Sequence, residues 1–237
     1  MNDFCAELHS FLNERNYVSP WILSTHAQNP ILASACSITT IKKKRYLFLQ
    51  GDENHNVYIV RTGRLRIFYS DLSSMEKCIY IVEQGGMVGE TSAFDQAPNY
   101  ASAYAITDAT LFKIHIQDLM RLINLHPSLS LRVIESLNYK VRLLSSQMEY
   151  FTKSAPVRVV STLIALCARY GTLQPDGSVR ISIRFTHEEM SNLINLNRVT
   201  VSKVFSDLLQ NQIVTNVGGH IVVPNIDILK TYLDERL

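Results

Sequence analysis

The sequence predicts an α+β fold in which antiparallel strands come first, a long helix follows, and two short helices with a β-hairpin come last. Three observations predict it. Short β-rich runs separated by turn residues recur from Ile38 to His115. Apolar residues then repeat at alternating spacings of three and four between 134 and 151. Beyond Pro156, two helical patterns are joined by a short turn and followed by a Gly-Gly hairpin.

Composition limits the classes of protein to consider. The chain has 237 residues, of which 46% are apolar, and a net charge of +2. From residue 155 onward, eight Lys or Arg residues stand against seven Asp or Glu residues. Contact with a nucleic acid would therefore depend on the placement of a few basic side chains, because overall charge is too small to attract one.

Targeting and metal-binding signals are both missing from the sequence. No apolar run approaches the roughly 20 residues of a membrane span, and the first 17 residues lack the pattern of a signal peptide. The four cysteines are scattered without CxxC spacing. We expect a cytoplasmic protein with reduced thiols, no membrane contact, no metal and no cofactor.

The N-terminal half divides into two predicted regions. Residues 1–35 read as a helical extension of one or two short helices, broken by Pro20 and Pro30. Residues 36–126 contain strand-like runs such as NVYIVRTG and RLRIFYS, with turn sequences such as GDENHN and TG between them. Closely spaced strands of this kind predict an antiparallel barrel or sandwich, here called the β-roll.

Residues 127–151 read as one helix with a heptad pattern. Its a and d positions form an apolar seam: Ile134, Leu137, Val141, Leu144, Met148 and Phe151. Such a narrow seam favours parallel pairing with a second copy of the helix, which predicts a homodimer. The alternative is a helix packed on its own β-roll.

A hinge is predicted at 152–156, and a second domain at 157–237. Thr186 and Glu189 fit a capping box, and Asn197 suits the N-cap of the following helix. Two short helices, a short turn and a β-hairpin wing together predict a winged helix-turn-helix.

The helix after Asn197 has two different faces. Val201, Val204, Phe205 and Leu208 follow the spacing of a buried face. Arg198 and Val199 lie on the other face, where a DNA major groove would explain both, since Arg reads guanine and Val contacts a thymine methyl. The remaining candidate DNA-binding residues, each of which is alternatively a solvated side chain, are Arg180, Arg184, Thr186, Asn197, Thr200, Ser202, Lys203 and His220.

Two stretches resemble the CRP/FNR family of bacterial transcription regulators: GGMVGETSAF (85–94) and THEEMSNLINLNRVTVSKVFSDLLQNQIV (186–214). The resemblance covers about residues 36–225. It implies a cyclic-nucleotide-binding-like jelly roll that senses a small effector, a dimerisation helix, and a winged helix-turn-helix that binds palindromic double-stranded DNA. By the same analogy, RNA polymerase is an expected partner.

The sequence departs from the family pattern in the DNA-reading helix. Many members have Arg-Glu-Thr-Val where this chain has Arg198-Val199-Thr200-Val201. Loss of the Glu removes an acceptor for the cytosine amine, so we expect an AT-rich site. This stretch is similar to that of the halophenol-sensing regulators of organohalide respiration.

The effector pocket also departs from the family pattern. Gly89-Glu90 is present, but Tyr100 and Ala101 occupy the Arg-Ser positions of cAMP-binding members, and residues 95–105 contain no Lys or Arg. A cyclic phosphate needs a cation or many donors, so the resemblance implies a neutral or aromatic ligand instead of cAMP. The candidate effector-binding residues are Gly89, Glu90, Tyr100, Ser102, Tyr104, Tyr139, Lys140 and Leu144.

Three alternatives remain open at the level of sequence. The winged helix could bind a protein instead of DNA, and the regulator could be ligand-independent or could respond to redox through Cys5. An enzyme is not expected, because no nucleophile–base pair, phosphate loop or metal spacing is present.

Overall fold

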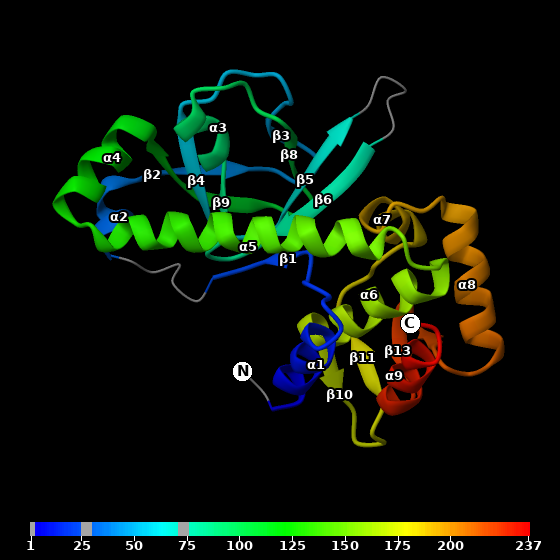
Figure 1. Cartoon of the computed structure of the whole chain (residues 1–237). Helices are drawn as coiled ribbons and strands as arrows, with labels where there is room; N and C mark the ends of the chain where they lie inside the picture. Colours follow the sequence, from blue (N-terminus) through cyan, green and yellow to red (C-terminus); the bar gives the residue numbers. More distant parts are fainter. Residues whose placement is uncertain (1–2, 25–29, 71–75) are drawn as a thin grey trace. The chain divides into compact units, whose positions relative to one another are not determined.

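Two compact units make up the chain. The computed structural model describes residues 3–24, 30–70 and 76–237 (Figure 1). One unit is residues 20–142, and the other combines residues 1–19 with 143–237. The predicted N-terminal extension, 1–35, therefore does not form a region of its own. Its first part belongs with the C-terminal domain and its second part with the β-roll.

The β-roll unit contains two sheets. The first has the strand order β1 (Trp21–Ile22), β6 (Glu76–Val82), β5 (Leu65–Ser70), β8 (Ser102–Ala105) and β3 (Tyr46–Phe48). The second has the order β2 (Ser37–Ile41), β9 (Ala109–His115), β4 (Asn56–Thr62) and β7 (Met87–Val88). β1 pairs with β6 in parallel, and the other pairs between described residues are antiparallel. The predicted jelly-roll class is confirmed.

The described residues of this unit also form the short helices α2 (Pro30–Ala35), α3 (Glu90–Asp95) and α4 (Ile116–Leu125). Gly89 precedes α3 with a φ of 82°, and a Cβ atom there would lie 2.7 Å from the Asn56 carbonyl oxygen. The close approach and the left-handed backbone both require glycine, which places Glu90 at the first turn of α3 beside β4.

The long helix α5 (Ser128–Tyr150) begins in the β-roll unit and ends in the C-terminal unit. Leu129 and Val133 enter the hydrophobic core of the β-roll, together with Leu32, Ile59 and Met87. α5 therefore contributes one face to the core of the unit that holds the predicted effector site.

The C-terminal unit follows the predicted order of elements: α6 (Ala155–Tyr170), β10 (Gly171–Leu173), β11 (Val179–Ile181), α7 (His187–Leu193), α8 (Arg198–Gln210), β12 (Thr215–Val217), β13 (His220–Val223) and α9 (Ile226–Asp234). Its sheet has the order β10-β11-β13-β12, with antiparallel pairs. Gly218 and Gly219, both with positive φ, form the turn of the wing. The predicted winged helix-turn-helix is present.

The break between α5 and α6 is shorter than the predicted hinge at 152–156. Ser154 is the extended N-cap of α6, and Ala155 and Pro156 lie in its first turn. Proline fits there because the first turn of a helix has no partner for its N–H groups. The non-helical stretch is thus 151–154.

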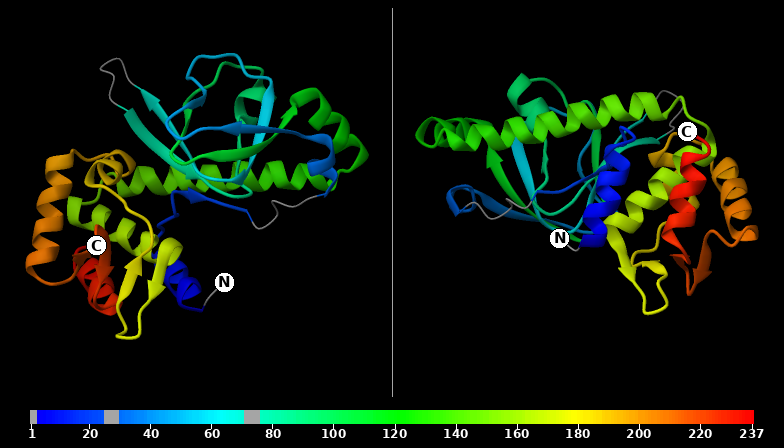
Figure 2. Two further views of the ribbon diagram at one scale, coloured as in Figure 1. Left: turned by 180° about the vertical axis from the view of Figure 1, so that it is seen from behind. Right: turned by 60° about the horizontal axis from the view of Figure 1, so that its bottom comes forward.

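Helix α1 (Asp3–Asn13) packs against α6 within the C-terminal unit (Figures 1 and 2). Its buried residues, Leu8 and Leu12, explain this placement, since they need an apolar surface to cover them. Polar contacts hold the same segment. Arg15 pairs with Asp234 at 2.6 Å, and the Tyr17 hydroxyl lies 3.3 Å from Thr162 Oγ1.

Candidate functional sites

The helix-turn-helix is fixed by side-chain caps at both of its helices. Thr186 Oγ1 accepts a hydrogen bond from Glu189 N at 3.1 Å, and Glu189 Oε2 accepts one from Thr186 N at 2.7 Å. Asn197 Oδ1 accepts a hydrogen bond from Thr200 N at 2.7 Å. Both predicted caps are confirmed, and they set where α8 begins and which residues its first turn presents.

The two faces of α8 differ as predicted. Val201, Val204, Phe205 and Leu208 are buried. Arg198, Val199 and Lys203 are exposed, and within the described residues the Arg198 and Lys203 side chains form no hydrogen bond or ion pair. The Val199 side chain is 64% exposed between these two cations. This face therefore offers two cationic donors and a hydrocarbon contact to a partner.

Several other candidate DNA-binding residues have partners within the unit. Thr186 and Asn197 act as caps, while Ser202 Oγ lies 3.0 Å from His187 Nδ1. Thr200 is half-buried, and its N–H is held by the Asn197 cap. The contacts of these side chains fix the position of α8. Arg198, Val199 and Lys203 are the exposed residues near its N-terminal end.

The sheet and the segment before α7 place further basic residues in the same unit. Arg180 on β11 is exposed, and so is Arg184, whose guanidinium lies against the wing turn at Gly219. His220 is half-buried, with Nδ1 3.0 Å from the Ile181 carbonyl oxygen. Arg180 and Arg184 are thus available to an outside partner, whereas His220 joins β13 to β11.

The predicted effector site contains a buried ion pair. Glu90 and Lys140 are 0% and 5% exposed, and the Lys140 ammonium contacts Glu90 Oε1. The ammonium also donates to the Met87 carbonyl oxygen at 2.9 Å, and Ser136 Oγ donates to Glu90 Oε1 at 3.1 Å. Oε2 of Glu90 is buried without a hydrogen-bond partner among the described residues. That oxygen is an acceptor that a ligand donor could satisfy.

Two tyrosines lie beside this pair. The Tyr80 and Tyr100 hydroxyls are 2.6 Å apart, and Tyr100 as a whole residue is 46% exposed although its hydroxyl contacts buried Tyr80. Burial raises the pKa of Tyr80 well above its ordinary value, and neighbouring Tyr100 and Glu90 raise it further. Burial also raises the pKa of Tyr100. Both phenols are therefore neutral hydrogen-bond donors at physiological pH.

The cavity at this position is small. It has a volume of about 10 Å³ and is bordered by Tyr80, Glu90 and Tyr100, among other residues. A space of this size holds about one water molecule. The space as it stands is therefore too small for a larger ligand.

The structure separates the other candidate effector residues. Ser102 Oγ accepts a hydrogen bond from Gln50 N at 2.9 Å, and the Tyr104 ring packs edge-on against Tyr46 at 5.2 Å. Tyr139 lines a different cavity, and Leu144 lies on the exposed seam in the C-terminal unit. Gly89, Glu90, Tyr100 and Lys140 are the candidates that come together.

Sequence reasoning missed Tyr80 and Ser136 at this site. Ser136 precedes Lys140 by four residues and so shares a face of α5 with it, a spacing that could have indicated its place. Tyr80 lies in the apolar run of β6, where nothing in the sequence distinguishes it from core residues.

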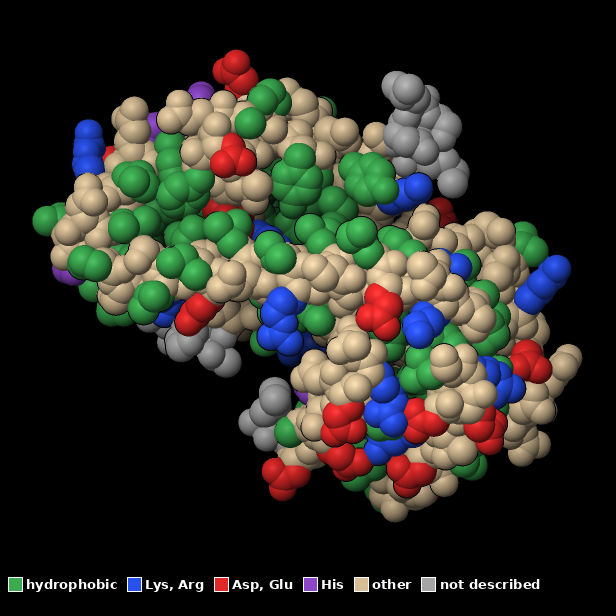
Figure 3. Space-filling view, viewed as in Figure 1, with side chains coloured by type: hydrophobic (Ala, Val, Ile, Leu, Met, Phe, Trp, Pro, Cys, Tyr) green, Lys and Arg blue, Asp and Glu red, His purple; other side chains and the backbone are tan. Residues whose placement is uncertain are grey.

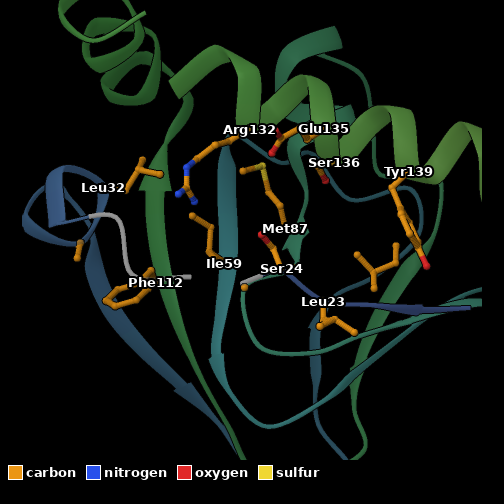
Figure 4. A pocket seen from close by; sticks show the side chains of 14 residues that line it. Leu23, Ser24, Leu32, Ile59, Met87, Phe112, Arg132, Glu135, Ser136 and Tyr139 are labelled. Carbon is orange, nitrogen blue, oxygen red and sulfur yellow. The ribbon is translucent and has the colours of Figure 1, made fainter. Parts of the chain in front are cut away.

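A second cavity of about 310 Å³ lies in the β-roll unit. α5 forms one wall, while β1, β4, β7, β9 and α2 contribute to the others (Figure 4). Its lining residues are Ile22, Leu23, Ser24, Leu32, Ala33, Ile59, Gly85, Gly86, Met87, Phe112, Arg132, Glu135, Ser136 and Tyr139.

The predicted seam of α5 is largely exposed. Val141 and Met148 are 63% and 74% exposed, Ile134, Leu144 and Phe151 are also exposed, and Leu137 packs on the β-roll core. Hydrophobic side chains gather along α5 in the space-filling view (Figure 3). An exposed apolar row of this length is typical of a surface that meets another protein chain.

Among the described residues, the cysteines and the other metal-binding residue types do not gather into a site. Burial raises the pKa of Cys78 and Cys167 to about 12 and that of Cys36 to about 11, so these thiols stay protonated. Within the described ranges, no group of His, Cys, Asp or Glu side chains is arranged to hold a metal ion. No helix among those residues is long and apolar enough to span a membrane.

Comparison with known families identifies both units. Residues 38–126 match the model of the cyclic nucleotide-binding domain, and residues 157–232 match that of the Crp-like helix-turn-helix domain. The chain belongs to the CRP/FNR family of transcription regulators. The expectation that it is no enzyme is confirmed, because its curated relatives are transcription regulators.

Several known proteins are similar to this CRP/FNR-family regulator. A CRP-like cAMP-activated global transcriptional regulator from Mycobacterium tuberculosis is 28% identical over 162 residues, covering 68% of this chain and 72% of the relative. A CooA mutant from Carboxydothermus hydrogenoformans has a TM-score of 0.74 at 21% identity, covering 89% of this chain and 92% of that one. A cysteine-to-serine variant of CprK in complex with OCPA has a TM-score of 0.68 at 18% identity, covering 84% of this chain and 90% of that one. The two structural likenesses show a common fold.

Proposed function

We propose that this regulator binds a palindromic, AT-rich DNA site as a homodimer in the cytoplasm and that a small effector in the β-roll controls this binding. The observation that carries the proposal is the exposed face of α8, where Val199 lies between Arg198 and Lys203. Arg198 would read guanine as a two-pronged donor, and Val199 would contact a thymine methyl. Lys203, Arg180 and Arg184 would contact phosphates.

The exposed seam of α5 supports the homodimer. Two copies packed through these residues would bury the apolar row in a parallel coiled coil. The two copies of α8 would then read half-sites about 34 Å apart, one turn of DNA, which implies a palindrome. By family analogy, the DNA-bound dimer acts on RNA polymerase.

The buried charges support an uncharged effector. The name of the Mycobacterium tuberculosis relative gives cAMP as its activator. In this chain Lys140 pairs with Glu90, and the loop 95–105 has no Lys or Arg, which disfavours a cyclic phosphate at this position. A neutral ligand, such as a protonated phenol, would donate to Glu90 Oε2 and lie against Tyr80 and Tyr100.

The effector would act by shifting the equilibrium between a DNA-competent state of the protein and a state that does not bind DNA. A ligand that separates Lys140 from Glu90, or strengthens their contact, changes how α5 is held by the β-roll. It alters DNA binding only to the extent that it binds the DNA-competent state more tightly.

A binding selection tests the function. The full-length protein is mixed with a random pool of duplex DNA, first alone and then with phenol, with ortho-chlorophenol or with cAMP. We expect a palindrome with AT-rich half-sites, recovered alone or with a phenol. Arg198→Ala combined with Lys203→Ala should abolish recovery, while Arg121→Ala, an exposed residue of α4, should not.

Two outcomes would contradict the proposal. Recovery of no sequence under any of these conditions would favour a winged helix that binds protein. Recovery of a palindrome only when cAMP is present would show that the proposed uncharged ligand is wrong, while the proposed DNA binding would stand.

A further inference from the structure

We propose that residues 15–18 act as a clasp that fixes the break between α5 and α6, and that opening the clasp turns this break into a hinge. The break itself is weakly held. Phe151, Thr152 and Ser154 are exposed, and the backbone N–H groups of 151–153 donate to carbonyl groups of the last turn of α5. Ser154 caps α6 without a side-chain hydrogen bond. An exposed stretch with such local bonds opens easily unless other contacts hold it.

The clasp contacts the last two turns of α5. Ser146 Oγ accepts a hydrogen bond from Val18 N at 2.9 Å and donates one to the Asn16 carbonyl oxygen at 2.8 Å. One turn later, the Tyr150 hydroxyl donates to the Arg15 carbonyl oxygen at 3.3 Å. Ser146 and Tyr150 are both buried, so water competes little for these bonds.

The clasp contacts α6 through the side chain of Tyr17. Its ring packs edge-on against that of Tyr150, with the ring centroids 4.8 Å apart. Its hydroxyl lies 3.3 Å from Thr162 Oγ1, in the middle of α6. Tyr17 and Thr162 are both buried. One side chain therefore touches α5 on one side of the break and α6 on the other.

The end of α1 fixes the path of the clasp. Asn16 has a φ of 57°, and its N–H donates to the Asn13 carbonyl oxygen. The Tyr17 N–H donates to the Leu12 carbonyl oxygen. These two bonds form a Schellman motif, in which asparagine can take the left-handed position. Because Leu12 is buried where α1 packs on α6, the docking of α1 also positions the clasp.

The clasp is close in sequence to a strand of the β-roll. Val18 lies three residues before Trp21, the first residue of β1, and β1 pairs with β6. A displacement of β1 would therefore pull on the hydrogen bond between Val18 and Ser146. With the clasp closed, the end of α5 and α6 move as one body. With it open, they are joined through 151–154 and can bend there.

Limited digestion of the full-length protein with trypsin, without DNA, tests the clasp, because Lys153 lies in the break. Ser146→Ala removes the hydroxyl that bonds Val18 and Asn16. We expect cleavage after Lys153 to be about tenfold or more faster in this variant, since it leaves two buried backbone groups without a partner. Mass spectrometry identifies the fragments that end at 153, and hydrogen exchange at 151–154 should accelerate in parallel.

Two controls separate local opening from general loosening. Ser145→Ala makes the same change at the adjacent exposed position and should leave the cleavage rate unchanged. Cleavage after Arg180, which is exposed on β11 of the same unit, should not rise in Ser146→Ala. At Tyr17, Phe keeps the ring and loses the hydroxyl, so Tyr17→Phe should accelerate cleavage after Lys153 less than Tyr17→Ala does. This pair also tests the clasp if Ser146→Ala does not fold.

Three results would overturn the proposal. The first is equal cleavage after Lys153 in the unmodified protein and in Ser146→Ala, whether fast or slow. The second is an equal rise after Arg180, which would mean that the whole unit is loosened. The third is a Tyr17→Ala protein whose break is cut no faster than that of the unmodified protein. Each is independent of whether the protein binds DNA, because the digestion contains none.

Discussion

Val199 is an apolar residue on a polar, cationic surface. Replacing it with Glu would place a carboxylate beside Arg198, where it can accept a hydrogen bond from a cytosine amine. We expect Val199→Glu to shift the selected site toward a G·C pair at that position, with a preference of about 1–3 kcal/mol over A·T. Binding selection measures the shift, and Val199→Ala, which adds no acceptor, should retain an AT-rich site. A G·C requirement in the unmodified protein would contradict this role.

Lys140 neutralises the buried carboxylate of Glu90. Lys140→Met would leave that charge unpaired, and breaking a buried pair in this way costs about 3–5 kcal/mol. We expect the free energy of unfolding in urea to fall by this order. Combining the change with Glu90→Gln removes the uncompensated charge and should restore much of the loss. If the double variant were no more stable than the single one, charge burial would not be the cause.

Individual residues differ in how far the sequence predicts their roles. Thr186, Glu189 and Asn197 were predicted as caps because capping depends on residues three apart in the chain. The pairing of Glu90 with Lys140 joins residues 50 positions apart. The sequence marks each of them as a candidate, but only folding brings them into contact.

The exposed apolar seam of α5 is the proposed dimer interface. Met148→Asp would place a charge in the proposed seam, where the side chain is 74% exposed in the single chain. Burying an unpaired carboxylate in a coiled coil is unfavourable, so we expect the dimer to dissociate in sedimentation and the DNA affinity to fall. Arg142→Asp, exposed on the same helix but off the seam, should remain dimeric. A dimeric Met148→Asp protein would mean that α5 is not the interface.

Elements with strong local patterns were predicted well, and short ones were not. The heptad of α5 is periodic over many residues, and the wing hairpin has a Gly-Gly turn signal. β1 has two residues and pairs in parallel with β6, so it has no alternation to recognise. The start of α6 was placed too late because Pro156 was taken as a break, although proline is accepted in a first turn.

The docking of α1 links pH to the stability of the whole molecule. Burial lowers the pKa of His9 from its ordinary 6.5, and nearby Arg169 lowers it further. His187, on α7, is shifted in the same direction by burial and then by Arg198. Just below pH 6.5 the unfolded chain therefore binds more protons than the folded chain. The stability that comes from keeping these two histidines neutral is present above about pH 6.5 and is lost as the pH falls below it.

We expect the melting temperature to fall between about pH 7 and pH 5, and His9→Gln and His187→Gln each to reduce that dependence. Scanning calorimetry across this range measures it. If the variant with both substitutions showed the same pH dependence of the melting temperature as the unmodified protein, other groups would cause the acid sensitivity.

The docking of α1 on α6 is a feature of the whole molecule that the sequence did not predict. The apolar residues Leu8 and Leu12 indicate a helix with a buried face, but they do not identify its partner. That partner, α6, begins more than 140 residues later in the chain. No local pattern encodes so distant a contact.

Since residues 1–19 fold with residues 143–237, the polypeptide crosses between the two units twice, at 19–20 and at 142–143. The second crossing lies within the continuous helix α5, and the first precedes β1. A single proteolytic cut at 19–20 would leave the units joined through α5. A C-terminal fragment that began at residue 143 would lack Leu8, Leu12 and Arg15, and its α6 surface would be open to water. We therefore expect a stable fragment that contains the helix-turn-helix to need residues from both ends of the chain.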